Sequence, residues 1–229
     1  MAQDNNMSDL WKRLRFVLVC IIVYRIGTHI PIPGIDPVRV SSLFDQNQGT
    51  ILELFNLFSG GALERMSIFA LNVVPYISAA IIMQLFSNAI PYLIELKKEG
   101  QAGRNAITQY TRYGTVALAF VQASALAVTL SASGLAYDPG TSFFVTAVFT
   151  VVAGTVFLMW LGEQITERGI GNGISIIIAT SILTGIPGAI GQALEQARQG
   201  DLNILMLLSI GVLAMIVIAI VVFIERGQR

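Results

Sequence analysis

Six long apolar stretches, separated by polar segments, dominate the residue pattern of the chain. A helix needs about 20 mostly apolar residues to cross a lipid bilayer. The fourth and sixth stretches meet this condition most clearly, and residues 204–224 form 21 residues without a charge. The pattern predicts six membrane-spanning helices, over residues 16–32, 68–90, 113–130, 143–161, 174–190 and 204–224.

Two of these spans are interrupted. Arg25 lies past the middle of the first span, and the sequence 185–188, which contains Pro187, is expected to break the fifth. The first span follows basic residues, as the apolar region of a signal peptide does, but it continues into Pro31 without a small-x-small cleavage pattern. We therefore interpret it as a retained span and not as a cleavable signal.

Composition supports this membrane class. Hydrophobic residues make up 54% of the 229 residues and charged residues 12%, whereas soluble domains carry about 25% charged residues. The net charge is zero, which argues against a nucleic-acid-binding protein. Cys20 and His29 are single residues of their types, so an internal disulfide and a multi-cysteine or multi-histidine metal site are excluded. We expect no cofactor, and the fold class is an all-α polytopic membrane protein.

Basic residues indicate the orientation of the spans. Cytosolic loops of membrane proteins carry an excess of Lys and Arg, and six spans place both termini on one side. That side, predicted to be cytosolic, holds Lys12, Arg13, Arg15, Lys97, Lys98, Arg104, Arg112, Arg168, Arg226 and Arg229, against Arg39, Arg65 and Arg198 on the other.

Polar residues inside the spans suggest that some of them line a cavity. Pro75 should kink or break the second span, which also contains Asn72 and Gln84. Irregular backbone at membrane depth is tolerated only inside protein or beside water. The second span therefore either lines a water-filled cavity or is a buried helix with a packing kink. A charge such as Arg25 costs about 3 kcal/mol on insertion scales, so it should face protein or water or extend to the outer interface. Of these, we expect it to anchor a neighbouring loop.

The segment 54–63, Leu-Phe-Asn-Leu-Phe-Ser-Gly-Gly-Ala-Leu, is too apolar for a solvated loop and too short to cross the bilayer. Either a re-entrant hydrophobic element or a helix lying in the membrane interface fits this composition. The glycine-rich sequence 169–173 lacks the pattern of a phosphate-binding loop, and we expect a tight turn between two helices there.

The residues alone leave two functional hypotheses. Catalytic motifs of hydrolases and metalloproteases are absent from the sequence, so an enzyme is not expected. One is a passive channel that apolar side chains close by excluding water from the pore. This hypothesis fits predicted helices that are kinked and carry scattered polar residues. A membrane scaffold or a small-solute channel subunit is the alternative, and only a pore would conduct when the short apolar segment is deleted.

Multi-residue motifs from the first span to the end of the chain carry a resemblance. They are 25–27 (Arg-Ile-Gly), 30–36 (Ile-Pro-Ile-Pro-Gly-Ile-Asp), 56–63, 75–79 (Pro-Tyr-Ile-Ser-Ala), 97–100, 109–114, 160–176 and 225–229. Together they resemble the SecY family, the channel subunits of the bacterial protein-conducting translocon. The family has ten spans in two inverted halves. The resemblance therefore implies an N-terminal half over 1–190, with a plug at about 55–66, followed over 191–229 by an external loop and the sixth span. The remaining four spans would be missing, through truncation or because the protein is split.

The resemblance also implies three devices for this chain. A ring of apolar side chains that constricts the pore corresponds to Val73, Ile77, Ile174 and Ile178. The plug that closes the channel from outside corresponds to Phe55, Asn56, Leu57, Phe58, Ser59, Gly60, Gly61, Ala62 and Leu63. Polar positions that face the lateral gate correspond to Ser78 and Gln122.

The implied function is translocation of unfolded secretory polypeptides across the bacterial cytoplasmic membrane and lateral release of membrane helices into lipid. The implied partners are SecE, SecG, the SecA ATPase, the ribosome, signal sequences, nascent polypeptides and the lipid bilayer. The channel itself would supply no energy and would read no nucleic acid directly.

Overall fold

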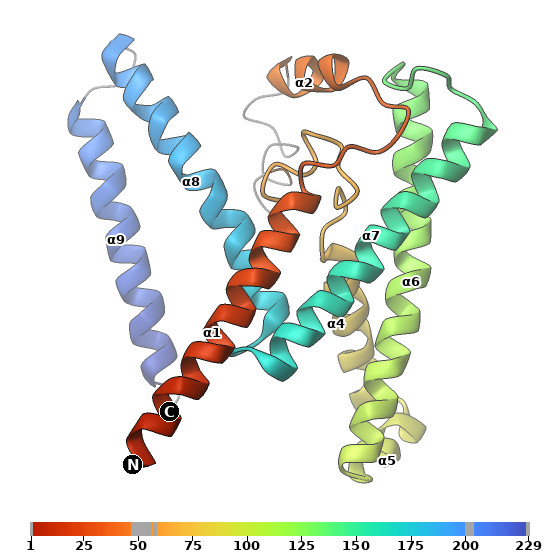
Figure 1. The fold of residues 1–229 in the computed structure, drawn as a ribbon, viewed down its shortest axis with the longest axis vertical. Helices are drawn as coiled ribbons and strands as arrows, with labels where there is room; N and C mark the ends of the chain where they lie inside the picture. Colours follow the sequence, from red (N-terminus) through yellow and green to blue (C-terminus); the bar gives the residue numbers. More distant parts are fainter. Residues whose placement is uncertain (1, 47–55, 57–58, 200–203, 228–229) are drawn as a thin grey trace. The chain divides into compact units, whose positions relative to one another are not determined.

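The computed structural model of the protein describes residues 2–46, 56, 59–199 and 204–227. Every regular element among these residues is a helix, as predicted. The chain divides into two compact units, Met1–Leu183 and Thr184–Arg229, and the division falls within one helix. The helices, labelled in Figure 1, are α1 (Ala2–Gly27), α2 (Pro37–Gln46), α4 (Val74–Ala89), α5 (Pro91–Lys98), α6 (Gln101–Ala132), α7 (Thr141–Arg168), α8 (Gly173–Gln199) and α9 (Ile204–Gly227).

In the first unit α6 packs against α7 and α4, and α1 packs against α7. Small side chains make the close packing of α6 possible, because Ala119, Ala123 and Ala127 recur every four residues and are buried. Ala123 and Ala127 belong to a hydrophobic cluster that also contains Val148 and Val151 of α7. This cluster joins the two longest helices of the unit.

Among the described residues, α6 and α7 are each long and apolar enough to cross a membrane. A third crossing is possible if α4 and α5 form one broken span, since the two are bent by 93° at the break. The uncharged stretch predicted as the sixth span is helical within α9. The first predicted span lies mainly in α1, which begins earlier than predicted and ends at Gly27.

The predicted start of the second span is wrong. We expected a helix from residue 68, but the backbone forms turns up to Val73 and α4 begins at Val74. Pro75 therefore does not kink a helix; it lies in the first turn, where its missing N–H costs nothing. Asn72, just before the helix, has a left-handed backbone with φ of 49°, a conformation that asparagine tolerates better than most residues.

The expected break in the fifth span is also wrong, because α8 runs from Gly173 to Gln199 with Pro187 inside it. Proline inside a helix removes one backbone hydrogen bond, and this loss does not end α8. The turn expected before this helix is confirmed. α7 ends at Arg168, Gly171 has a positive φ of 71°, and α8 begins at Gly173.

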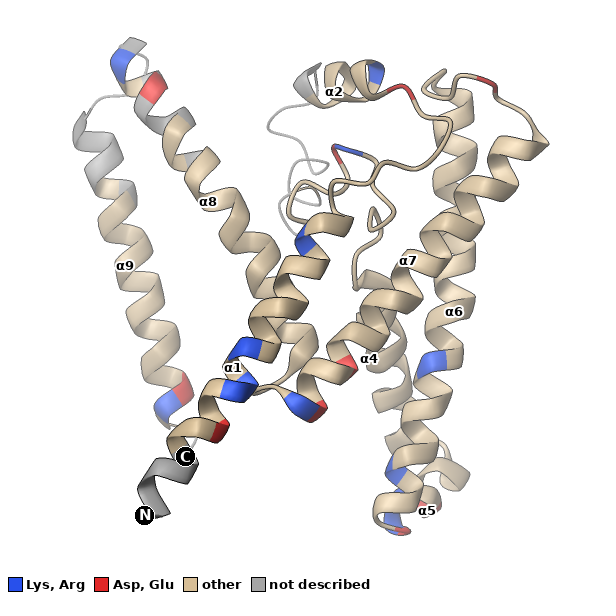
Figure 2. Ribbon diagram, in the orientation of Figure 1, with Lys and Arg blue, Asp and Glu red and all other residues tan. Residues whose placement is uncertain are grey.

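Charged residues gather at the ends of the helices of the first unit. Figure 2 shows Lys and Arg on the N-terminal part of α1, where α5 ends and α6 begins, and at the end of α7. Beyond Arg112, the rest of α6 carries no charge, and α7 carries none before Glu163. This distribution fits helices whose middle sections lie in lipid.

Candidate functional site

Four aliphatic side chains that the resemblance assigned to a pore ring lie together in the first unit. Val73, Ile77, Ile174 and Ile178 belong to a single hydrophobic cluster, in which Val73 is buried and the three isoleucines are half-buried. Val73 is the N-cap residue of α4, and its carbonyl accepts a hydrogen bond of 3.0 Å from the N–H of Ile77. These four residues are called the collar below.

The turn before α8 fixes the direction of the other two collar residues. The Oδ1 atom of Asn172 accepts hydrogen bonds from the N–H groups of Ile174 and Ser175, at 3.0 and 3.3 Å, and so caps the helix. The hydroxyl of Thr166 on α7 accepts a bond of 2.8 Å from the N–H of Gly173. A methyl group on Gly162 of α7 would overlap the side chain of Ile174. Glycine at that position therefore lets the collar residue pack directly on α7.

The segment 55–66 is called the plug segment below, and its described residue Ala62 packs in the same cluster as the collar. Phe55, Leu57 and Phe58 fall outside the described residues. Asn56 and Ser59–Met66 are described, and Ala62 is fully buried in the same cluster as Val73. Gly60 and Gly61 have positive φ angles of 66° and 79°, so the chain makes a tight turn there that glycine adopts without strain.

Asn56 fastens the two sides of this turn. Its Oδ1 atom accepts a hydrogen bond of 3.0 Å from the N–H of Glu64, and its Nδ2 atom donates one of 2.9 Å to the Glu64 carboxylate. The hydroxyl of Ser59 accepts a further bond of 3.0 Å from the N–H of Leu63. The described part of the plug segment is thus a compact, internally bonded loop.

Two consecutive residues of α1 hold the near end of the plug segment. The hydroxyl of Tyr24 lies 3.2 Å from the carbonyl oxygen of Ser59, and the guanidinium of Arg25 donates a bond of 3.0 Å to the carbonyl of Gly60. The expectation that Arg25 anchors a neighbouring loop is therefore confirmed. Tyr24 was not identified from the sequence, because it looks like any other apolar residue of the first span.

A polar group lies beside the collar. The hydroxyl of Tyr24 is 2.6 Å from the hydroxyl of Ser181 on α8, and the side-chain amide of Asn72 donates a bond of 3.4 Å to the same Ser181 oxygen. All three residues are at least 97% buried. Ser181 was also missed, although it follows Ile174 and Ile178 at helical spacing, seven and three residues later, and so lies on their face of α8.

Backbone pairs hold the far end of the plug segment. The N–H of Ile32 donates to the carbonyl of Met66 at 2.8 Å, and the N–H of Ile68 donates to the carbonyl of Ile30 at 2.9 Å. The loop after α1 is bonded in turn to the loop after α6, through Asp36 N–H to Leu135 carbonyl at 2.9 Å. The far end is therefore bonded directly to the loop after α1 and, through that loop, to the loop after α6.

Aromatic rings support the backbone between the plug segment and α4. The ring of Phe69 stacks between Tyr24 and Phe157, at centroid distances of 6.0 and 5.9 Å. A methyl group on Gly27 would overlap the Phe69 ring, and one on Gly154 would overlap the carbonyl of Ile68. Gly27 therefore lets α1, and Gly154 lets α7, approach residues 68 and 69 closely.

The predicted gate residues lie on neighbouring helices. Ser78 on α4 and Gln122 on α6 are both half-buried, and α4 packs against α6. Within the described part of the chain, no hydrogen bond joins the two side chains. An apolar row on α4, formed by Ile81, Ile82 and Leu85, is exposed.

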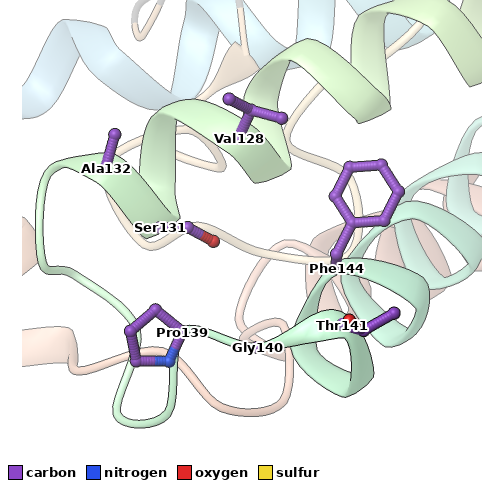
Figure 3. Close-up of a pocket in the computed structure, with 7 residues that line it drawn as sticks. All are labelled: Val128, Ser131, Ala132, Pro139, Gly140, Thr141 and Phe144. Carbon is purple, nitrogen blue, oxygen red and sulfur yellow. The ribbon is translucent and has the colours of Figure 1, made fainter.

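An open pocket lies where α6 leads into α7 (Figure 3). Its volume is about 660 Å³, and it is lined by Val128, Ser131, Ala132, Pro139, Gly140, Thr141 and Phe144. These residues offer apolar surface and two hydroxyl groups but no charged group. The pocket lacks the side chains that proton transfer or metal binding would require.

A comparison with models of protein families identifies the family of the chain. A family model described as SecY matches residues 67–229. The chain belongs to the SecY family. The resemblance that the motifs carried is thereby confirmed.

Curated relatives of the chain are protein translocase subunits. The chain is 62% identical over 226 residues to the protein translocase subunit SecY of Pseudomonas aeruginosa, covering 99% of this chain and 51% of the relative. It is 56% identical over 232 residues to that of Escherichia coli strain K12, covering 100% of this chain and 52% of the relative. The chain spans about half the length of these two SecY relatives. By their names, they are translocase subunits.

Solved structures share the fold. Sec61 in the canine ribosome–channel complex from the endoplasmic reticulum matches with a TM-score of 0.67 and 20% identity, covering 93% of this chain and 47% of that one. A chain from a structure of a protein-conducting channel matches with the same values. At this identity the similarity establishes the fold alone, and it confirms the predicted class, an all-α membrane fold corresponding to about half of a channel chain.

Proposed function

We propose that this chain forms half of the wall of a protein-conducting channel. The channel moves unfolded secretory polypeptides across the bacterial cytoplasmic membrane and releases membrane helices sideways into lipid. The observation that supports the proposal most directly is that the four collar residues share a cluster with buried Ala62 of the plug segment. The residues that we propose as constriction and plug therefore lie in one unit of the chain.

The collar acts as a barrier through its chemistry. Isoleucine and valine side chains are stiff at χ1 and offer ions no ligands, and an apolar constriction of this kind closes a pore by dewetting. An extended polypeptide can still pass, because apolar side chains yield around it without breaking hydrogen bonds. Val73 is smaller than isoleucine, which makes the collar slightly wider on its side.

The plug segment closes the pore from the external side in the proposed mechanism. A signal sequence enters at the lateral gate, whose wall on this half of the channel is formed by α4 and α6 with Ser78 and Gln122. The plug segment then shifts, and the polypeptide passes the collar. Weak polar contacts at the gate suit this role, since an entering apolar segment displaces them at small cost. The exposed apolar residues of α4 offer such a segment a surface.

In the proposed mechanism, partner proteins supply the energy for translocation and hold the channel together. The energy for movement comes from the SecA ATPase or from synthesis on the ribosome, SecE clamps the two halves of the channel, and SecG binds at the periphery. The chain lies in the inner membrane with both ends cytosolic, an orientation supported by the excess of basic residues on that side. The chain spans about half the length of its SecY relatives, in keeping with the proposal that it forms half of the pore wall.

The double variant Ile77→Gly and Ile174→Gly tests the collar in the full-length channel. We expect a higher resting ion conductance in planar bilayers, because removing two aliphatic side chains admits water to the constriction. The matched control is Ile81→Gly with Leu183→Gly, which alters two exposed aliphatic residues of α4 and α8. Equal conductance in the collar variant, the control and the parent would count against the channel and favour the scaffold alternative.

A further inference from the structure

The hydrogen-bonded group formed by Tyr24, Asn72 and Ser181 lies between the collar and the plug segment. Ser181 is on the collar face of α8, one turn beyond Ile178. The hydroxyl of Tyr24 is within hydrogen-bond distance of both Ser181 Oγ, at 2.6 Å, and the Ser59 carbonyl, at 3.2 Å. This hydroxyl therefore has two possible acceptors, one on the wall of the proposed pore and one on the plug segment.

The number of protons limits which bonds can exist together. A hydroxyl carries one hydrogen, so Tyr24 and Ser181 can each donate one bond at a time. Ser181 can donate either to Tyr24 or to the Ile177 carbonyl of its own helix, which lies 2.9 Å away. Two arrangements follow. The bonds at Ser181 are short, at 2.6 and 2.9 Å, whereas the bond from Tyr24 to the Ser59 carbonyl is longer, at 3.2 Å, and therefore weaker.

In the first arrangement Ser181 donates to Tyr24, and Tyr24 donates to the Ser59 carbonyl. The plug segment is then bonded to α1 and, through α1, to α8. In the second arrangement Tyr24 donates to Ser181, and Ser181 donates to the Ile177 carbonyl. The plug segment is then free of Tyr24, yet both hydroxyl protons still have an acceptor. Asn72 donates to Ser181 in either case.

We infer that Tyr24 and Ser181 form a two-position hydrogen-bond latch on the plug segment, which bonds the Ser59 carbonyl in one arrangement and frees it in the other, while Arg25 bonds Gly60 in both. Leaving a buried donor without an acceptor is costly, and the second arrangement avoids that cost when the segment departs. The inference rests on the proposed function only in taking residues 55–66 as the plug. Tyr24 and Ser181 are positioning residues, since the polypeptide itself would not need to touch them.

The latch controls the near end of the segment. The far end is held by the backbone bonds that Met66 and Ile68 make to residues 30–32, and these do not involve Tyr24 or Ser181. Opening should therefore be confined to the stretch between Ser59 and Arg65. Its amides include Gly61 N–H, bonded to the Asn56 carbonyl, and Leu63 N–H, bonded to the Ser59 hydroxyl.

The latch predicts that removing the Tyr24 hydroxyl and removing the Ser181 hydroxyl change amide hydrogen exchange over 59–67 in opposite directions. The exchange is measured on the full-length protein in lipid nanodiscs. Tyr24→Phe keeps the ring that stacks on Phe69 but removes the latch, and exchange should be about fivefold faster, as loss of one ordinary hydrogen bond implies. Ser181→Ala removes the alternative acceptor, so release leaves the Tyr24 hydroxyl without an acceptor, and exchange should be slower by about fivefold or more.

The control is Ser131→Ala on α6, whose hydroxyl also bonds a carbonyl four residues earlier but lies away from the plug segment; its exchange over 59–67 should match the parent. A packing role for the two residues predicts faster exchange in both variants, and that result, or no change in either, would overturn the latch. If Tyr24→Phe does not fold, the sign for Ser181→Ala decides alone. Amide exchange measures opening of the plug segment and not ion conduction. The latch can therefore be judged even if the Ile77→Gly and Ile174→Gly variant shows no change in conductance.

Discussion

The guanidinium of Arg25 donates a hydrogen bond of 3.0 Å to the carbonyl oxygen of Gly60. Arg25 is the one charged residue inside the first predicted span, and Gly60 is a buried residue of the plug segment. The bond therefore gives the guanidinium an acceptor at membrane depth, and it also fixes the near end of the plug segment. A charged donor makes a stronger bond than a neutral one, so Arg25 should hold the segment more firmly than Tyr24 does.

Replacing Arg25 with methionine tests this anchor. The variant keeps a long, apolar side chain but removes the donor to Gly60. Hydrogen bonds to charged groups contribute about 1.5–3 kcal/mol, so amide exchange over 59–67 should be roughly 10- to 100-fold faster. The resting conductance of the full-length channel should rise in parallel.

Arg65→Met is the matched control, since Arg65 is exposed and makes only a long bond of 3.4 Å, to the Gly61 carbonyl. We expect a small change in exchange for that variant. Similar exchange rates for the Arg25 and Arg65 variants would show that the half-buried guanidinium of Arg25 is not the anchor.

Gly27→Ala tests the close approach of α1 to Phe69. A methyl group there overlaps the Phe69 ring, and the ring cannot move freely because it stacks between Tyr24 and Phe157. Overpacking a well-filled core costs typically 1–3 kcal/mol. The variant should therefore unfold at a lower temperature in detergent, as followed by circular dichroism.

Gly211→Ala on α9 provides the comparison for this experiment. A methyl group at Gly211 meets no described atom within 4 Å, and alanine is a better helix former than glycine by about 1 kcal/mol. Its unfolding temperature should be equal to that of the parent or higher. An unfolding temperature for Gly27→Ala that is not lower than the parent value would contradict the packing argument.

Much of the fold follows from the hydropathy pattern, because apolar stretches of this length have few stable alternatives in a membrane. α6, α7 and α9 cover their predicted spans. The collar residues could also be paired from the resemblance and from their i, i+4 spacing, which puts each pair on one helix face.

Other features depend on tertiary contacts that a linear pattern does not contain. Residues 68–73 are as apolar as a helix would be, yet they form turns because Phe69 and Asn72 are held by α1, α7 and α8. Proline had opposite effects in two places: Pro75 begins α4, whereas Pro187 lies inside α8. The bonds of Tyr24 to Ser59 and Ser181 join residues 35 and 157 positions apart, and no periodicity points to them.

The orientation of α6 in the membrane can be tested by thiol labelling. α5 precedes α6 and the loop with Tyr137 follows it, so Lys98 and Tyr137, both exposed, flank the helix at its two ends. Because basic residues mark the cytosolic side, Lys98 should be cytosolic and Tyr137 external. Cys20 is buried, and a Cys20→Ser background removes it as a source of signal.

In that background, Tyr137→Cys should react with a membrane-impermeant maleimide in intact spheroplasts, and Lys98→Cys only after lysis. Labelling both variants after denaturation in detergent gives the total amount of each. The reverse pattern would invert the predicted orientation. Equal labelling of both variants in intact spheroplasts would mean that α6 does not separate the two sides, and the assignment of Gln101–Ala132 as a membrane-spanning helix would fail with it.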